Sequence, residues 1–269
     1  MKNNLSRLLN DLPLFLRSIK QPNLDRGYFP KSALLIVAHP DDPEYFCAGT
    51  IARWAQSGAE VRYIICTSGQ MGSKNSNTNP DEIGGIREGE QIEAARLTGV
   101  KDVVFLRHQD GLLEDTITLR HQLVCELRRF RPEVVITNDP LIYFGEDFIN
   151  HPDHRAVAEA TLAAVYPLAG SPLIFQDLEN EGLKAHAVRK LYIFTWNQPN
   201  TWVDITDTID IKIAALKLHH SQIGNSDPAD AIRQAAARSA KFLRMTYAEP
   251  YRVIRLISDE DWPGLSERA

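Results

Sequence analysis

Short apolar runs alternate with helix-length segments through the first half of this sequence, and that alternation restricts the fold more than any other feature. Four short, mainly apolar runs have the length of strands buried on both faces: Ala33–Ala38, Val61–Cys66, Val103–Leu106 and Val134–Thr137. Segments of helical length lie between them at residues 48–57, 84–98 and 116–130, and they end at or just before Gly58, Gly99 and Pro132. This order predicts an α/β domain with a mainly parallel sheet and helices on both faces.

The second half of the chain adds elements to the same domain. Apolar and helical patterns predict strands at Leu191–Trp196 and Trp202–Ile205, helices at about 208–222 and 228–243, and a last apolar segment at Val253–Ile257. A chain of 269 residues with 43% hydrophobic content is long enough to bury one large α/β core. We therefore predict a single domain over residues 1–269, in which residues 1–30 form a helical extension and residues from about 190 to 269 complete the domain.

Composition argues against several classes of partner. The net charge is only −5 and no Lys/Arg cluster recurs along a face or tail, which argues against nucleic-acid binding. The leucine-rich N-terminus has no small-residue cleavage site, and no stretch reaches the roughly 18 apolar residues of a membrane span. The three cysteines lie in apolar stretches and show no C-x-x-C spacing: Cys47, Cys66 and Cys125. This pattern predicts reduced, packed thiols. We expect a cytoplasmic protein, with no membrane partner, that acts on small, neutral or weakly charged substrates.

Two polar clusters at the ends of predicted elements indicate a metal site. The first, residues 38–44, closes the first strand, and the second, residues 151–154, precedes a helical segment. His39 and Asp42 are three residues apart where the strand enters a turn, so both side chains can reach one point, and His154 completes a His-Asp-His triad. A triad with open positions suits zinc, which lowers the pKa of a bound water to about 7. The predicted cofactor is therefore Zn²⁺.

The other polar residues of the clusters have the chemistry needed for proton transfer. Asp41 lies beside a ligand, and we assign it as the general base, a role worth roughly 10²–10⁴ in rate. His151 is predicted to face the substrate, where a protonated imidazole could stabilise an oxyanion and protonate a leaving amine. Asp153 is predicted to hold that ring in its tautomer. Either cluster alone is explained equally well as a turn, since Pro and Asp favour turns, but their occurrence together favours a site.

These clusters belong to a longer set of motifs that resembles the LmbE/PIG-L family of zinc-dependent N-acetylglucosamine deacetylases over most of the chain. The matching motifs are Ala38–Asp42, Gly49–Ala52, Thr67–Gly72, Arg87–Glu90, Gln109–Gly111, Asp139–Pro140 and His151–His154. The diacetylchitobiose deacetylase branch is similar at Val203–Asp207, Lys212, His219–Gln222 and Tyr247–Glu249. The resemblance implies a Rossmann-like (LmbE-like) fold, one zinc ion, and hydrolysis of the acetamide on the sugar C2 nitrogen to amine and acetate.

The same resemblance implies a role for each motif position. His39, Asp42 and His154 match the zinc ligands, Asp41 the base, and His151 the oxyanion-stabilising residue. Arg87 and Asp110 match positions that contact sugar or aglycone, although without the family pattern the segment around Arg87 would be interpreted as a solvated helix face. A small amino-sugar substrate and a symmetric homo-oligomer, such as a hexamer, are also implied.

Three other functions use the same residue types. The first is a deacetylase or amidase of thiol biosynthesis, acting on a glucosaminyl malate or inositol glycoside. The second is an iron(II) oxygenase, since two histidines and a carboxylate also form its facial triad. However, that triad usually begins His-x-Asp on an antiparallel framework, whereas this chain has His-x-x-Asp in an α/β pattern. The third is a non-catalytic sugar-binding module, which would need neither the base Asp41 nor the acid His151.

Two features outside the clusters have competing interpretations. Among the tryptophans, Trp202 is the candidate for stacking on a sugar, although aromatic residues in strands more often belong to the core. The pair His219–His220 falls within a helical pattern, and we interpret it as a solvated or interface pair rather than as metal ligands.

Overall fold

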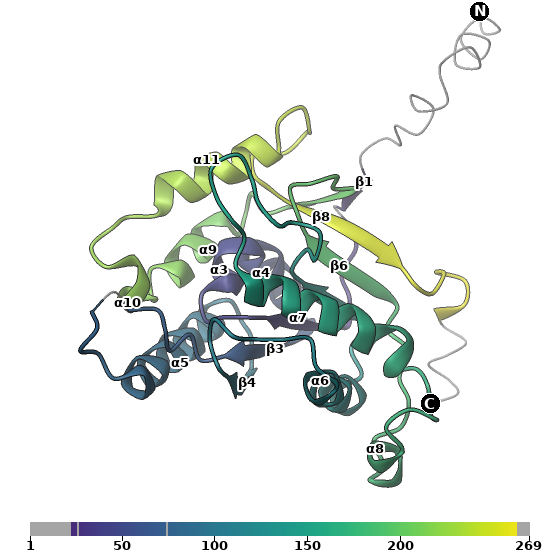
Figure 1. The fold of residues 1–269 in the computed structure, drawn as a ribbon. Helices are drawn as coiled ribbons and strands as arrows, with labels where there is room; N and C mark the ends of the chain where they lie inside the picture. Colours follow the sequence, from purple (N-terminus) through teal and green to yellow (C-terminus); the bar gives the residue numbers. More distant parts are fainter. Residues whose placement is uncertain (1–22, 26, 74, 263–269) are drawn as a thin grey trace, which may run out of the picture.

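The computed structural model describes residues 23–25, 27–73 and 75–262, and the strands in this part of the chain form one eight-stranded sheet (Figure 1). The order across the sheet is β1-β7-β8-β6-β5-β2-β3-β4. The strands are β1 (Asn23–Asp25), β2 (Ser32–Val37), β3 (Glu60–Thr67), β4 (Asp102–His108), β5 (Val134–Thr137), β6 (Lys190–Phe194), β7 (Thr201–Asp204) and β8 (Ala248–Arg255). All neighbours are parallel except that β8 runs antiparallel to β6 and β7. The predicted mainly parallel sheet is confirmed.

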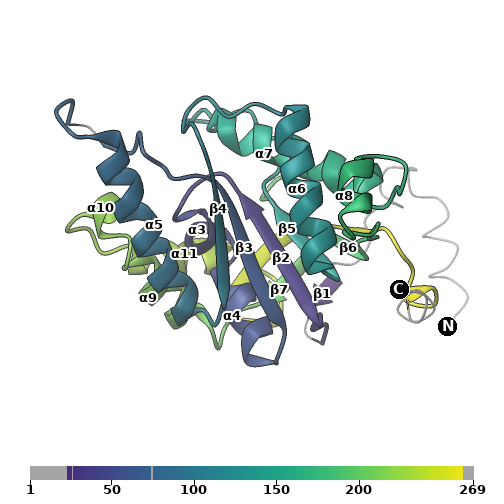
Figure 2. The ribbon, with the colours of Figure 1, turned by 90° about the horizontal axis from the view of Figure 1, so that it is seen from below.

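Helices cover both faces of the sheet, and each face has its own apolar core (Figure 2). They are α3 (Asp42–Phe46), α4 (Ala48–Gln56), α5 (Pro80–Leu97), α6 (Ile117–Phe130), α7 (Pro152–Ala163), the π-helical turn η1 (Ala164–Leu168), α8 (Gln176–Asn180), α9 (Ile209–Leu216), α10 (His220–Ile223) and α11 (Ala229–Ser239). Leu35 belongs to the same core as Trp54 of α4 and Ile213 of α9, whereas its neighbour Ile36 belongs to the core that contains Leu123 of α6. Successive strand residues enter different cores because their side chains point to opposite faces.

The connections around β2 place a crevice at one edge of the sheet. From β2 the chain passes through α4 to β3 on one side, and it later returns from β4 through α6 to β5 on the other side of β2. In open α/β sheets, ligands bind beyond the carboxyl ends of the strands at such a reversal of strand order. The segments that follow β2, β4 and β5 therefore lead into the place where a site is expected.

Several boundaries differ from the sequence prediction. The helix α5 begins at Pro80 rather than at 84, because the side-chain oxygen of Asn79 accepts a hydrogen bond at 3.0 Å from the first turn. The helix predicted at 208–222 is broken into α9 and α10, since His219 turns into the core between them. The strand β8 begins at Ala248, earlier than the apolar segment that predicted it.

The N-terminal prediction is corrected in part. Residues 23–25 were expected in a helical extension but form β1, which pairs with β7; residues 1–22 of that extension lie outside the described residues. Cys47 and Cys66 are buried, Cys125 is half-buried, and all three are free thiols. Among the helices that the structure describes, none is both long and apolar enough to cross a membrane.

Candidate metal centre and active site

Two histidines and an aspartate from the two predicted clusters converge beyond the carboxyl end of β2. The Nδ1 atom of His39 lies 3.3 Å from Nε2 of His154, and that Nε2 atom lies 3.0 Å from Oδ1 of Asp42. Each residue contributes one potential ligand atom, and the three atoms lie within 4.8 Å of one another. Two ring nitrogens that face each other at hydrogen-bond distance need a shared proton or a shared cation between them. The structure thus assembles the predicted ligand set.

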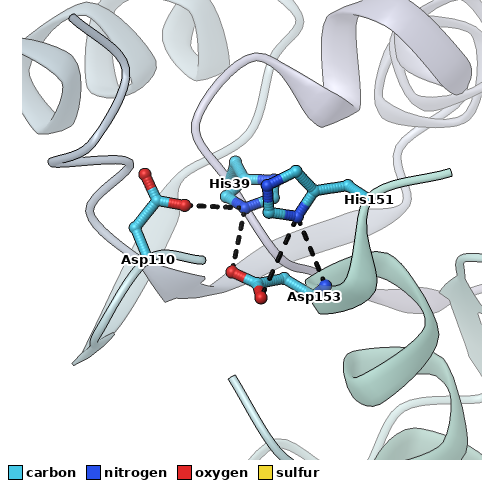
Figure 3. A group of neighbouring side chains, drawn as sticks. All are labelled: His39, Asp110, His151 and Asp153. Carbon is cyan, nitrogen blue, oxygen red and sulfur yellow. Dashed lines mark hydrogen bonds and ion pairs between the residues drawn. The ribbon is translucent and has the colours of Figure 1, made fainter. Parts of the chain in front are cut away.

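The outer nitrogens of the same rings are held by other polar groups. Nε2 of His39 lies 3.2 Å from Oδ1 of Asp110 and 3.2 Å from Oδ2 of Asp153 (Figure 3). Nδ1 of His154 lies 3.1 Å from Oδ1 of Asn150. Metal-binding histidines are usually oriented by such outer contacts, which fix the tautomer and leave the inward nitrogen for the metal. The residues present therefore fit a metal ion of the kind that takes nitrogen and oxygen ligands.

Negative charge dominates the surroundings of His39. Burial lowers the pKa of its imidazole, but Asp110, Asp153 and Asp42 outweigh that effect and raise the pKa to about 10. Burial alone would raise the pKa of the Asp42 carboxyl, yet His154 and His39 hold this pKa well below its usual range. Several buried carboxylates around two imidazoles form an environment that favours a bound cation.

A second group of possible ligands approaches the opposite nitrogen of His39. The potential ligand atoms of four residues lie within 4.8 Å of one another in this group: His39, Asp110, His151 and Asp153. The Asp153 carboxylate is already occupied, however, because it accepts hydrogen bonds from two backbone N–H groups at 2.8 and 3.2 Å as well as contacting His39. The first set is the better metal site, since within the described part of the chain Oδ1 of Asp42 and the two facing ring nitrogens have no backbone partner.

Asp41 occupies an unusual backbone position beside the candidate metal ligands. Its φ angle is 89°, in the left-handed region that non-glycine residues rarely adopt, and its N–H donates to Oε1 of Gln91 at 2.9 Å. Nη2 of Arg87 lies 3.3 Å from its Oδ2. Burial raises the pKa of the Asp41 carboxyl to about 6, although Arg87 opposes the increase. Backbone strain of this kind is concentrated at functional sites, and a pKa near neutrality suits a general base.

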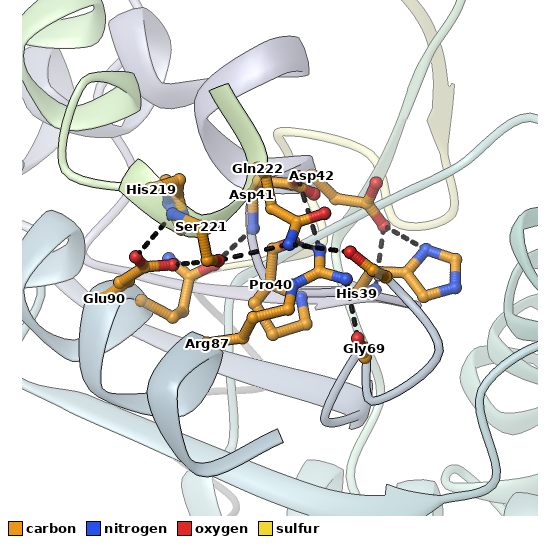
Figure 4. Close-up of polar contacts among 12 residues, drawn as sticks. His39, Pro40, Asp41, Asp42, Gly69, Arg87, Glu90, His219, Ser221 and Gln222 are labelled. Carbon is orange, nitrogen blue, oxygen red and sulfur yellow. Dashed lines mark hydrogen bonds and ion pairs between the residues drawn. The ribbon is translucent and has the colours of Figure 1, made fainter. Parts of the chain in front are cut away.

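Arg87 is anchored by the backbone of two loops (Figure 4). Its Nη1 donates to the carbonyl of Gly69 at 2.8 Å, and its Nη2 donates to the carbonyl of Pro40 at 2.6 Å. A Cβ atom on either Gly69 or Gly72 would collide with this guanidinium group. The two glycines of the Thr67–Gly72 motif therefore make room for Arg87. The alternative interpretation of this segment as a solvated helix face is wrong at Arg87, which is only 5% exposed.

Sequence reasoning missed a buried polar chain behind Asp41. Nε2 of Gln91 lies 3.2 Å from both carboxylate oxygens of Glu44, and Oε2 of Glu44 lies 3.0 Å from Nε2 of His219. Glu44, Gln91 and His219 are all fully buried, so the interpretation of His219 as a solvated or interface residue is wrong; His220 is exposed. One feature of the sequence could have indicated this chain of contacts. Gln91 lies four residues after Arg87 and hence on the same face of the helix.

His151 stands at the N-terminal end of α7, with its ring edge against His39 at a centroid distance of 4.6 Å. Its Nδ1 accepts the N–H of Asp153 at 3.3 Å, which leaves the proton of the neutral ring on Nε2. Burial and the nearby His39 lower the pKa of His151, which opposes the predicted protonated ring. The role predicted for Asp153 also changes. Its carboxylate lies 3.9 Å from Nδ1 of His151 but 3.2 Å from His39, so it positions His39 while its backbone orients His151.

A cavity of about 620 Å³ opens in front of these groups. Predicted site residues on its wall are His39, Asp41, Asp42, Arg87, Asp110, His151 and His154. Asp153 is fully buried behind them, and Trp202 lies elsewhere. The cavity has the size of a small-molecule site, with a few polar groups converging on one end and the apolar side chains of Phe46, Met71 and Leu112 around them.

Known proteins resemble this chain in sequence and in structure. The PIG-L family model, described as GlcNAc-PI de-N-acetylase, matches residues 34–165. Diacetylchitobiose deacetylase of Thermococcus kodakarensis is 33% identical over 71% of this chain and 70% of its own length. A 1D-myo-inositol 2-acetamido-2-deoxy-alpha-D-glucopyranoside deacetylase from a Mycobacterium species is 29% identical over 71% and 73%. The structure of N,N'-diacetylchitobiose deacetylase from Pyrococcus horikoshii with an inhibitor has a TM-score of 0.78 at 29% identity and covers 84% of each chain.

Proposed function

Because this chain belongs to the PIG-L/LmbE family of deacetylases, we propose that it is a zinc-dependent hydrolase that removes the N-acetyl group from N-acetylglucosamine or short chitooligosaccharides. The proposal rests on the arrangement of side chains on one wall of the cavity. There the inward ligand atoms of His39, Asp42 and His154 lie beside the buried carboxylate of Asp41 and the ring of His151. The similarity to two diacetylchitobiose deacetylases supports a substrate of that type.

The metal would be held by His39, Asp42 and His154. When bound, zinc supplies a Lewis acid that polarises an amide carbonyl and lowers the pKa of water to about 7. Asp110 and Asp153 keep the His39 ring turned toward the metal position through its outer nitrogen.

The chain's own groups divide the proton transfers between them. Asp41 accepts a proton from the water whose oxygen bonds to the acetyl carbon, and Arg87 keeps that carboxylate oriented. The Nε2–H of His151 donates a hydrogen bond to the amide oxygen as negative charge develops there. Asp41 then passes the proton that it accepted from water to the sugar nitrogen as the C–N bond breaks. The products are acetate and the free amine. Arg87 and Asp110, both on the cavity wall, are proposed to contact the sugar hydroxyls.

The proposal extends to the setting of the enzyme. The family resemblance supports a symmetric homo-oligomer, such as a hexamer, and the free cysteines are compatible with a cytoplasmic location. Light scattering coupled to size exclusion of the purified protein measures the assembly directly, and a monomer at micromolar concentration would contradict that part.

An acetate-release assay tests the activity. Zinc-loaded protein should release acetate from diacetylchitobiose or N-acetylglucosamine, lose activity on chelation, and regain it with zinc. The panel should include glucosaminyl malate and inositol conjugates carrying the same N-acetyl group, because a relative named for the inositol glycoside is 29% identical. Faster turnover of those conjugates would assign the chain to thiol biosynthesis, and no release from any substrate would reject the function.

Two neighbouring aspartates provide a matched pair of variants. Asp42→Ala removes a proposed ligand and should lower the zinc content of the purified protein. Asp41→Asn should retain zinc and lose roughly 10²–10⁴ in rate, because it keeps the shape of the side chain and removes the base. Equal loss of zinc in both variants would show that the division of roles between Asp41 and Asp42 is wrong.

A further inference from the structure

A second cavity of about 630 Å³ lies beside the catalytic pocket, beyond the carboxyl end of β6 and next to α11. The two cavities share Tyr45 and Phe46 on their walls. The chain thus forms two neighbouring hollows of similar volume, of which only the first contains metal-capable residues within the described part of the chain.

Phe46 forms the partition between the two hollows. Its ring meets the ring of His154 edge-on at a centroid distance of 6.0 Å, and it stacks on Phe194 of the second cavity at 4.5 Å with an interplanar angle of 9°. The second cavity therefore begins one aromatic ring away from a proposed metal ligand. Tyr45, which is 44% exposed, borders both hollows, so it forms a solvent-accessible rim between them.

The lining of the second cavity combines aromatic faces with polar groups. Trp196, which is 55% exposed, and the half-buried Trp202 both lie on its wall. Arg238 and Ser239 of α11 add hydrogen-bonding groups, and within the described residues the Arg238 guanidinium has no hydrogen bond or ion pair. Lys212 and Glu249 also reach the wall, but they satisfy each other at 2.6 Å.

We propose that this second cavity is the subsite for the sugar ring attached to the reacting N-acetylglucosamine. An aromatic face attracts the slightly positive C–H groups of a pyranose, while the sugar hydroxyls need donors and acceptors such as Arg238 and Ser239. A simple alkyl chain would make no use of those hydrogen-bonding groups. The inference rests on the proposed function, since it takes the ring in the first cavity to be the amino sugar.

The test compares binding of one sugar ring with binding of two. In the zinc-loaded Asp41→Asn background, which suppresses turnover, calorimetry measures the Kd of N-acetylglucosamine and of diacetylchitobiose. The disaccharide should bind more tightly, and adding Trp196→Ala should weaken the disaccharide by about five- to tenfold, the size of one aromatic contact, while changing the monosaccharide less than twofold. Phe144→Ala is the control, because Phe144 is equally aromatic, 74% exposed and lines neither cavity.

Any other outcome would contradict the proposal that the second cavity is a sugar subsite. Equal weakening of both sugars by Trp196→Ala would place the residue in the catalytic pocket, and no effect on either would remove it from recognition. A change in oligomeric state with unchanged sugar Kd would make the cavity an interface between copies. Failure of the proposed function is seen separately, as absence of acetate release by the wild-type protein from every sugar.

Discussion

Two buried charged clusters lie near the same edge of the sheet, and they differ in how their charges are balanced. Around His39 and His154, three carboxylates surround two imidazoles, and inward ring nitrogens face each other at 3.3 Å. In the other cluster, Lys212 donates to Glu249 at 2.6 Å, one cation to one anion. Glu249 also accepts two backbone N–H groups of α4 and the hydroxyl of Tyr251.

This difference in charge balance distinguishes the candidate metal site from a cluster that only supports the fold. The balanced cluster stabilises the start of α4, because its one cation and one anion pair with each other and Glu249 also accepts the backbone N–H groups of Gly49 and Thr50. The metal-capable cluster has an excess of negative charge, and among the described residues its inward atoms are paired only with one another. Burial alone therefore does not identify function; the unbalanced charge does.

Breaking the balanced cluster should have the largest effect on stability. Glu249→Ala leaves Lys212 buried without a partner, so the free energy of unfolding should fall by about 3–5 kcal/mol. Denaturant unfolding of the metal-free protein measures this. The double variant Lys212→Met/Glu249→Leu should recover part of the loss, since it removes both charges. A Glu249→Ala protein of normal stability but reduced zinc affinity would contradict the separation of the clusters.

The next largest effect is expected at His186, a histidine outside both clusters, where the free energy of unfolding should depend on pH. Burial lowers the pKa of His186 from 6.5 to about 4, although a hydrogen bond to the Pro132 carbonyl opposes this. The unfolded chain therefore binds a proton that the folded chain does not, so His186 costs no stability above pH 6.5 and up to about 3 kcal/mol as pH falls toward 4. The difference in unfolding free energy between wild type and His186→Gln should follow this curve, and a pH-independent difference would contradict it.

The outer contacts of the metal-capable cluster should have a smaller effect, confined to metal binding. Asn150→Ala removes the partner of Nδ1 of His154, and the expected loss is about 10–100-fold in zinc affinity. Competition with a chromogenic chelator measures the affinity. Asn200→Ala is the control, because that amide bonds the backbone of β8 instead. Equal zinc affinity in both variants would mean that His154 needs no outer support.

The smallest effect is expected behind Asp41, the proposed general base. Gly69→Ala places a Cβ at a φ of 63° and against the Arg87 guanidinium, so about 1 kcal/mol of stability should be lost and Asp41 should lose part of its alignment. The turnover number should fall while zinc content stays constant. Gly85→Ala is the matched control, because no atom of the described residues lies within 4 Å of its added Cβ. Equal turnover in the two variants would remove Arg87 from the positioning of Asp41.

The central fold and the residues of the cavity wall could be predicted because their signals lie close together in the sequence. Alternating apolar runs and helix signals lie within short windows, and residues that follow parallel strands meet at one edge. This placed His39 beyond β2 and Asp110 beyond β4. The partners of these residues were harder to predict, because a short motif does not say which neighbour a carboxylate will touch. Asp153 accordingly contacts His39 more closely than His151, two residues before it.

Contacts between distant parts of the chain could not be predicted from one sequence. Glu44 meets His219, and Glu249 meets the N-terminus of α4, across most of the chain length. Nothing in the local pattern around His219 distinguishes a buried ring from a solvated one. The strand β1 was missed for the same reason, since three residues carry little signal and their pairing with β7 is set by the rest of the sheet.

The position of β8 has a consequence for synthesis. It is the last described strand along the chain, yet it lies between β6 and β7, so β7 and β1 join the rest of the sheet only through it. A growing chain on the ribosome therefore exposes the unpaired edge of β6 and leaves Lys212 without Glu249 until residues 248–255 emerge. A nascent chain that stalls before this point would be prone to edge-to-edge aggregation, and chaperone binding during translation should be longest at that stage.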